Sequence, residues 1–97
     1  MYGTVARFRL KPGAEADLMA LTNELVRDIP GLIGTSVFRT DNEPGIYYMA
    51  TRFTDRDAYW KNAQSPEQHE RYLRMAAFFD GEPEWHDGEV VYSSNES

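Results

Sequence analysis

The sequence contains no cysteine and has no excess of basic residues. Without cysteine the chain cannot form a disulfide, a thiolate metal site, an iron–sulfur cluster or a cysteine nucleophile. Ten Lys and Arg residues stand against sixteen Asp and Glu residues, which gives a net charge of -6. A general nucleic-acid binder needs a basic surface that displaces counterions from phosphates, so we expect no nucleic-acid partner.

Long apolar runs are also missing. No segment approaches the roughly 20 apolar residues of a membrane span, so we expect no membrane partner. The opening residues lack the charged start and apolar stretch of a signal peptide, which makes a cytoplasmic protein the expectation. No P-loop, G-x-G-x-x-G or G-x-S-x-G motif occurs, which argues against nucleotide binding and a serine-hydrolase site.

The composition that remains is typical of a globular domain. The chain has 97 residues, of which 41% are hydrophobic and 27% charged. A chain of this mass buries about 65% of its surface on folding, which is enough for a core without cross-links. No linker or repeat divides the sequence, so we expect a single domain over residues 1–97.

Periodicity and turn residues indicate the secondary structure. Residues 2–10 place Thr4, Ala6, Phe8 and Leu10 on one face, which is the period of a strand. In residues 14–29, apolar side chains recur at steps of three and four, which indicates a helix. Capping residues at 54–57 and 65–68 predict two further helix starts. The other expected elements are strands at 32–39, 46–53 and 85–92, helices at 54–62 and 65–79, and a frayed tail at 93–97.

This order is βαββαβ, with the second helix broken in two. It predicts an α+β fold of the ferredoxin-like, split-βαβ type. Right-handed crossovers would place the helical segments on one face of a four-stranded antiparallel sheet.

The other face of that sheet should be polar if it meets water. Strand 46–53 instead carries large apolar groups on both faces: Ile46, Tyr48 and Ala50 on one, and Tyr47, Met49 and Phe53 on the other. Several such residues together favour a partner that covers this face. A homodimer through the sheet face is the simplest partner, because one patch can be self-complementary about a two-fold axis.

The sequence resembles the antibiotic-biosynthesis-monooxygenase domain of the dimeric α+β barrel superfamily over roughly residues 2–92. Four segments carry the likeness: the first strand leading into Lys11-Pro12-Gly13, the segment 29–34 (IPGLIG), the block 52–60 (RFTDRDAYW), and 65–69 (SPEQH). The resemblance implies a dimer whose two sheets pack face to face. It also implies a pocket in each protomer between the sheet and the helices.

Within that frame we expect a cofactor-independent oxygenase that acts on a phenolic or quinol-like aromatic substrate and dioxygen. Such an enzyme needs an apolar pocket, a group that takes or polarises the phenol proton, and exclusion of water. His69 suits the acid–base role, and it shares a helical face with Tyr72 three residues on. The expected catalytic residues are His69, Tyr72 and Asn62, and the expected substrate-binding residues are Trp60, Phe79, Tyr48 and Arg52, with no cofactor and no metal.

Other interpretations remain open at this stage. The aromatic residues at helical spacing could simply be core, and the protein could be a non-catalytic dimer that binds a small molecule or serves assembly. Haem-degrading relatives use an Asn on the first strand, where this chain has Ala6, together with a Trp and an axial His that Trp60 and His69 would supply. Carboxylates and a histidine also gather in a short acidic segment that could bind a divalent ion. That segment contains Glu82, Glu84, His86 and Asp87.

Overall fold

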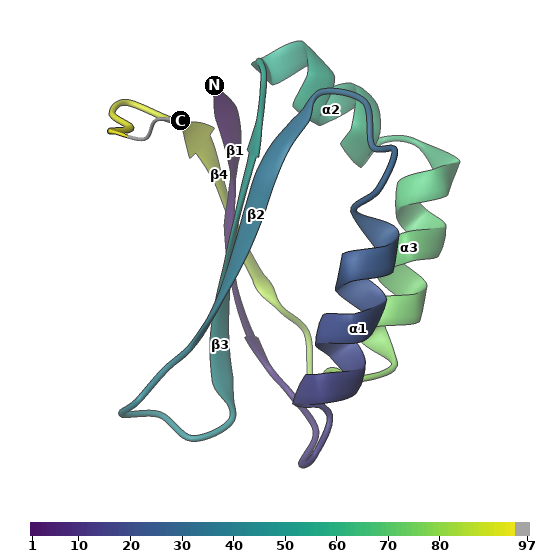
Figure 1. Ribbon diagram of the computed structural model, residues 1–97, viewed down its shortest axis with the longest axis vertical. Helices are drawn as coiled ribbons and strands as arrows, with labels where there is room; N and C mark the ends of the chain where they lie inside the picture. The colour runs from purple at the N-terminus through teal and green to yellow at the C-terminus, as the bar shows by residue number, and fades with distance from the viewer. Residues whose placement is uncertain (95–97) are drawn as a thin grey trace.

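The computed structural model describes residues 1–94, and it has one antiparallel sheet covered on one face by helices (Figure 1). The sheet order is β2-β3-β1-β4, as a ferredoxin-like split-βαβ fold requires. The predicted α+β class and element order are therefore confirmed. The elements are β1 (Tyr2–Arg9), α1 (Glu15–Leu25), β2 (Leu32–Arg39), β3 (Ile46–Phe53), α2 (Arg56–Ala63), α3 (Pro66–Ala76) and β4 (Glu84–Glu89).

Side-chain caps fix the starts of the two later helices. The Asp55 carboxylate accepts a hydrogen bond from the Ala58 amide at 2.8 Å, so Asp55 is the cap of α2 within the predicted capping segment 54–57. The Ser65 hydroxyl accepts one from the Gln68 amide at 3.0 Å, and Pro66 occupies the first helical position. Both interactions satisfy amide groups that have no partner within the helix, which is why these short helices begin where they do.

Three elements end earlier than the sequence predicts. Helix α1 ends at Leu25 rather than at residue 29, because Asp28 adopts a left-handed conformation (φ 61°) and the residue before Pro30 disfavours helix. Helix α3 ends at Ala76, so Phe79 lies beyond it and forms an isolated bridge to Leu10.

The third element that ends early is the strand predicted at 85–92. Strand β4 ends at Glu89, which pairs with Tyr2 at the start of β1. Beyond that point β4 has almost no neighbouring backbone to pair with, apart from one bond between the Val90 amide and the Met1 carbonyl. Val91 and Tyr92 are accordingly 93% and 81% exposed. Part of the predicted frayed tail, residues 95–97, lies outside the described residues.

The core lies between the sheet and the helices. The side chains that the alternation in β1 placed on one face are all buried there, from Thr4 to Leu10. They pack with Leu18 of α1, with Tyr47 and Met49 of β3, and with Phe79. Burying these apolar groups provides the main favourable free energy of this fold.

The opposite face of the sheet has no helix over it (Figure 1). We call it the open face, and the register places the following side chains on it: Val5, Arg7, Phe38, Tyr48, Ala50, Arg52 and His86. Val5 and Phe38 are among the large apolar residues most exposed to solvent. The open face is therefore partly apolar in the protomer.

Gly3 allows the two central strands to come together. It pairs with Arg52 of β3 on one side and with Gly88 of β4 on the other. A β-carbon at Gly3 would lie 1.8 Å from the Thr51 carbonyl oxygen, whereas one at Gly88 would meet no atom within 4 Å. Since the obstructing atom is backbone, no side-chain rotation can relieve the contact.

We predict that Gly3→Ala lowers the free energy of unfolding by about 1–3 kcal/mol, because it forces β1 and β3 apart. Gly88→Ala is the matched control, since it adds the same methyl group to a paired strand where there is space. Urea unfolding of the two variants is the measurement. Equal loss of stability in both would contradict the steric argument.

A polar cluster joins α1 to the sheet at the end away from α2. The Glu15 carboxylate accepts hydrogen bonds from Arg39 at 2.6 and 2.7 Å and from the Tyr47 hydroxyl at 2.6 Å. The Arg39 guanidinium, followed by the Tyr47 hydroxyl, lowers the pKa of Glu15 from 4.5 to about 2. Because the pKa is lower in the folded chain, the ionised carboxylate stabilises the fold.

The stability that the ionised Glu15 carboxylate contributes should be complete above about pH 4.5 and should be lost as the pH falls towards 2. We predict that the stability difference between the wild-type chain and Glu15→Gln narrows over that interval. An NMR titration of the side-chain carboxyls tests the cause directly, since Arg39→Gln should move the Glu15 pKa back towards 4.5. A Glu15 carboxyl that titrates near 4.5 in the wild-type chain would refute the prediction.

Candidate active site

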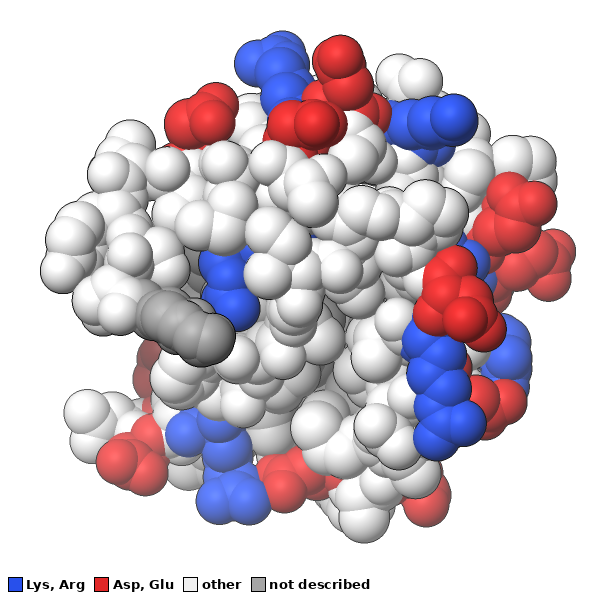
Figure 2. All heavy atoms as spheres, turned by 45° about the horizontal axis from the view of Figure 1, so that its top comes forward, with Lys and Arg blue, Asp and Glu red and all other residues white. Residues whose placement is uncertain are grey.

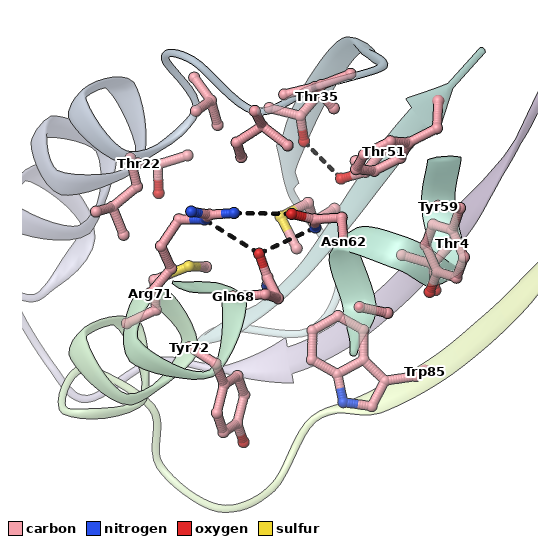
Figure 3. A pocket seen from close by; sticks show the side chains of 18 of the residues that line it. Thr4, Thr22, Thr35, Thr51, Tyr59, Asn62, Gln68, Arg71, Tyr72 and Trp85 are labelled. Atoms are coloured by element: carbon pink, nitrogen blue, oxygen red, sulfur yellow. Dashed lines mark hydrogen bonds between the residues drawn. The ribbon is translucent and has the colours of Figure 1, made fainter. Parts of the chain in front are cut away.

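A cavity of about 360 Å³ lies between the helices and the covered face of the sheet (Figure 3). Its volume is within the range of small-molecule sites. Helix α1 and the turn after it, strands β2, β3 and β4, and helix α3 supply an apolar lining. These apolar residues are Leu25, Val26, Ile29, Leu32, Met49, Phe53, Met75 and Trp85, together with Ala63 at the end of α2.

A polar network forms one wall of the cavity at the junction of α2 and α3. Arg71 donates hydrogen bonds to the Asn62 side-chain oxygen at 2.8 Å and to the Gln68 side-chain oxygen at 3.2 Å. The Asn62 amide in turn donates to the same Gln68 oxygen at 3.2 Å. Figure 3 shows these three side chains converging above the sheet.

The cap of α3 holds this network in place. The Ser65 hydroxyl donates to the Asn62 carbonyl at 2.7 Å while it accepts from the Gln68 amide. One hydroxyl therefore fixes the backbone at two of the three network residues. Side chains held by local backbone contacts of this kind lose little further freedom when a ligand binds.

Hydroxyl groups cross the sheet beneath the network. Thr35, Thr51, Thr4 and Asp87 are neighbours in register on four adjacent strands, and the three threonines line the cavity. The Thr35 and Thr51 hydroxyls are 2.8 Å apart and share a hydrogen bond. The Thr4 hydroxyl is buried and has no hydrogen-bond partner within residues 1–94.

Tyr59 of α2 completes this row at the edge of the cavity. Its hydroxyl donates to Asp87 at 2.5 Å. Burial, and then the hydrogen bond to the Asp87 carboxylate, raise the pKa of the Tyr59 phenol above its ordinary value. The phenol therefore stays protonated at neutral pH, so it is a donor in this site and not a base.

The structure brings the three expected catalytic residues to this one cavity. His69, Tyr72 and Asn62 all line it. Tyr72 packs against Trp85 of β4, with ring centroids 6.2 Å apart. His69 lies at the solvent-exposed side of the lining and makes no hydrogen bond through its ring within the described residues.

Two expected substrate-binding residues, Tyr48 and Arg52, lie on the open face instead of in the cavity. Side chains alternate along a strand, so these even-numbered positions of β3 point away from the helices while Met49 and Phe53 point towards them. Their expected place in the pocket is corrected.

Trp60 and Phe79, the other two expected binding residues, do not line the cavity either. Trp60 packs against Tyr2 and Tyr59, and its indole N–H is buried without a partner in residues 1–94. Consecutive residues on a helix point about 100° apart, so Tyr59 lines the cavity and Trp60 does not. Phe79 belongs to the core, where its ring centroid is 5.0 Å from that of Phe8.

The lining residues that the sequence did not predict include Tyr59, Gln68, Arg71 and Trp85. The sequence contains a signal for two of these residues, Gln68 and Arg71. Gln68 and Arg71 are three residues apart, and Tyr72 is four residues after Gln68, so all three share one helical face. Trp85 could not be placed without the register that sets it opposite Ala6.

The acidic segment after α3 does not form a metal centre in the part of the chain that the structure describes. No three His, Asp or Glu side chains come together there in a way that could hold an ion. His86 points to the open face and Asp87 to the covered face, because they are adjacent in a strand. Ala6, at the position of the Asn in haem-degrading relatives, is fully buried and does not line the cavity.

None of the helices in residues 1–94 is long and apolar enough to cross a membrane.

A single helix-covered sheet with a small, mostly apolar cavity defines an α+β domain with space for a small molecule. The model of the antibiotic biosynthesis monooxygenase family matches residues 1–75. The chain therefore belongs to that family, which confirms the resemblance seen in the sequence. No relative is found among the curated proteins.

Solved structures share the fold at low sequence identity. SnoaB, a cofactor-independent oxygenase from Streptomyces nogalater studied as its N63A mutant, is 18% identical with a TM-score of 0.78. The match covers 98% of this chain and 97% of that one. A protein of Bordetella bronchiseptica assigned to the antibiotic biosynthesis monooxygenases is 21% identical with a TM-score of 0.78, and the match covers 94% and 97% of the two chains.

Proposed function

We propose that this protein is a cofactor-independent monooxygenase that oxidises a phenolic or quinol-like aromatic substrate with dioxygen. The observation that carries the proposal is the cavity of about 360 Å³ with His69, Tyr72 and Asn62 at its wall, in a chain of a monooxygenase family. A purely structural module would fill this space with its own aromatic side chains. Here Trp60 and Phe79 pack elsewhere, so the space stays open.

The reaction needs only groups that this chain holds. His69 or Tyr72 polarises the phenol and helps its proton to leave, because an electron-rich phenolate can give one electron to dioxygen. The resulting substrate radical and superoxide combine at a ring carbon, and the peroxide takes up the proton. Loss of water from this hydroperoxide leaves the quinone, so one oxygen atom enters the product and the other leaves as water.

The remaining lining suits the same chemistry. Asn62 is fixed by Arg71 and Ser65, so its amide is held ready to orient a substrate oxygen. Trp85, Met75 and Phe53 provide the apolar contacts that exclude water from a flat ring.

We also propose that two copies of the chain pair through the open face. Val5 and Phe38 leave apolar surface exposed on a sheet face that no helix covers, and the same patch on a second copy can cover it.

We predict dioxygen uptake by the metal-stripped protein with at least one member of a panel of dihydroxyaromatic compounds, without added cofactor. His69→Ala and Asn62→Ala should each lower the rate by about 10²-fold or more, the usual scale for an acid–base or oxyanion-stabilising group. An oxygen electrode gives the rate, and the quinone is followed by its absorbance.

His86→Ala is the matched control, because His86 is the only other histidine and points to the opposite face of the sheet. Its rate should equal that of the wild-type chain. If His69→Ala turns over as fast as His86→Ala at every pH, the role of His69 is refuted. Absence of uptake across a broad panel would favour the non-catalytic binding protein, and a haem titration would follow.

For the dimer, light scattering after size exclusion should give twice the chain mass of 11.2 kDa. Phe38→Asp should shift the protein to a monomer, because it places a charge in the apolar patch. Leu73→Asp is the control, since Leu73 of α3 is similarly exposed, at 52% against 59%, but lies on the helical layer. A monomeric wild-type chain, or equal effects of both variants, would overturn this proposal.

A further inference from the structure

Arg71 is the only side chain lining the cavity that has a permanent charge at neutral pH. The chain contains sixteen acidic residues, yet no Asp or Glu of residues 1–94 lines this cavity. Figure 2 shows acidic side chains around the edge of the face in view, with basic ones between them. Among the described residues, the lining of this cavity in an acidic protein therefore has one positively charged side chain and no carboxylate.

The partners of Arg71 differ from those of the three arginines that form ion pairs within residues 1–94. Arg39 pairs with Glu15 at 2.6 Å, Arg7 with Glu43 at 3.3 Å, and Arg74 with Glu24 at 3.9 Å. Arg71 instead donates to two neutral amide oxygens, and no carboxylate oxygen of the described residues lies within 4.0 Å of it. Asp28 and Glu67 line a separate hollow on its other side but form no ion pair with it.

Two neutral acceptors orient a guanidinium without cancelling its charge. A guanidinium carries five N–H groups in a fixed plane. Two N–H groups of Arg71 donate hydrogen bonds to Asn62 and Gln68, and Arg71 makes no other side-chain hydrogen bond within residues 1–94. The remaining N–H groups are free to bind two oxygens of a carboxylate side by side, which is the geometry that a guanidinium favours.

A second unsatisfied group lies on the sheet, across the cavity from α3. Thr4 of β1 is only 8% exposed and lines the cavity. Its hydroxyl lies near the Tyr59 phenol without hydrogen-bond geometry to any described residue. Leaving a buried hydroxyl without a partner costs free energy, which a polar atom of a ligand would recover.

We propose that the ligand of this cavity is a hydroxyaromatic acid whose carboxylate binds Arg71. Its hydroxyl group meets Thr4, and its one- or two-ring body lies against the apolar side chains of Ile29, Met75 and Trp85. The volume of about 360 Å³ is near the lower end for ligand sites, which suits a ligand of this size. This inference rests on the proposed function, since it names the class of substrate for the same site.

The test compares 6-hydroxy-2-naphthoate with its neutral carboxamide by titration calorimetry at pH 7. We expect the wild-type chain to bind the acid at least tenfold more tightly than the amide. Arg71→Gln should weaken binding of the acid tenfold or more and binding of the amide less than twofold. Arg71→Lys should retain part of the preference for the acid, because it keeps the charge and loses the paired geometry.

Arg74→Gln is the matched control, because Arg74 lies three residues further along α3 and pairs with Glu24 outside the cavity. It should bind both probes as the wild-type chain does. Circular dichroism and thermal melting verify that each variant is folded, which matters because Arg71 also holds Asn62 and Gln68. The proposal is overturned if the wild-type chain binds both probes equally, if Arg71→Gln weakens both equally, or if the acid does not bind at millimolar concentration.

Dioxygen uptake with each probe separates this proposal from the one on which it rests. Binding of the acid through Arg71 without uptake by any hydroxyaromatic acid supports the anion site and counts against the oxygenase. Oxidation of the hydroxyaromatic acid with a rate and an apparent affinity that Arg71→Gln does not change supports the oxygenase and overturns the anion site.

Discussion

The pairing of β1 along both of its edges is the constraint on which the rest of this structure depends. Strand β3 on one side and β4 on the other hold β1 across the middle of the sheet. Its alternating side chains then divide the molecule into a covered face with the core and cavity, and an open face. Gly3 permits this arrangement, since any side chain there would meet the backbone of β3.

Polar groups line the cavity at two places, one on the helices and one on the sheet. The Ser65 hydroxyl joins α2 to α3 and so positions Asn62, Gln68 and Arg71 over the sheet. On the sheet side, Thr4 and the Thr35–Thr51 pair present hydroxyls to the same space. The cavity is therefore apolar in most of its lining and polar at two places, which allows it to orient a ligand as well as to enclose it.

Much of the fold could be predicted from the sequence, because local signals and the overall topology agree. The alternation in β1 and the cap at Ser65 are sufficient to place a strand and a helix. The residues at which helices and strands end were harder to predict. Whether β4 continues past Glu89 depends on whether β1 still offers backbone there, and that is a property of the register and not of the β4 sequence.

The candidate site could be predicted only in part, for the same reason. His69 and Tyr72 are three residues apart on α3, so helical spacing brings them to one face. Asn62 at the end of α2 reaches the same cavity because the Ser65 cap joins the two helices closely. Trp85 was missed because its position depends on the sheet register. Arg71 was missed because nothing in the sequence distinguishes it from a surface arginine until its neighbours are known. Tyr48 and Arg52 lie on the open face because side chains alternate along β3, and the sequence alone does not say which of its two faces the helices cover.

The places of β1 and β4 in the chain mean that their pairing closes the longest loop in the sheet. Tyr2 lies near one end of the described chain and its partner Glu89 near the other, so the β1–β4 edge requires closure of a very long loop. A chain emerging during synthesis can assemble β1, α1, β2 and β3 before β4 exists. Until β4 is synthesised and pairs, one edge of β1 has unpaired amides and carbonyls. During that interval this edge is the part of the nascent chain most prone to pair with a second chain.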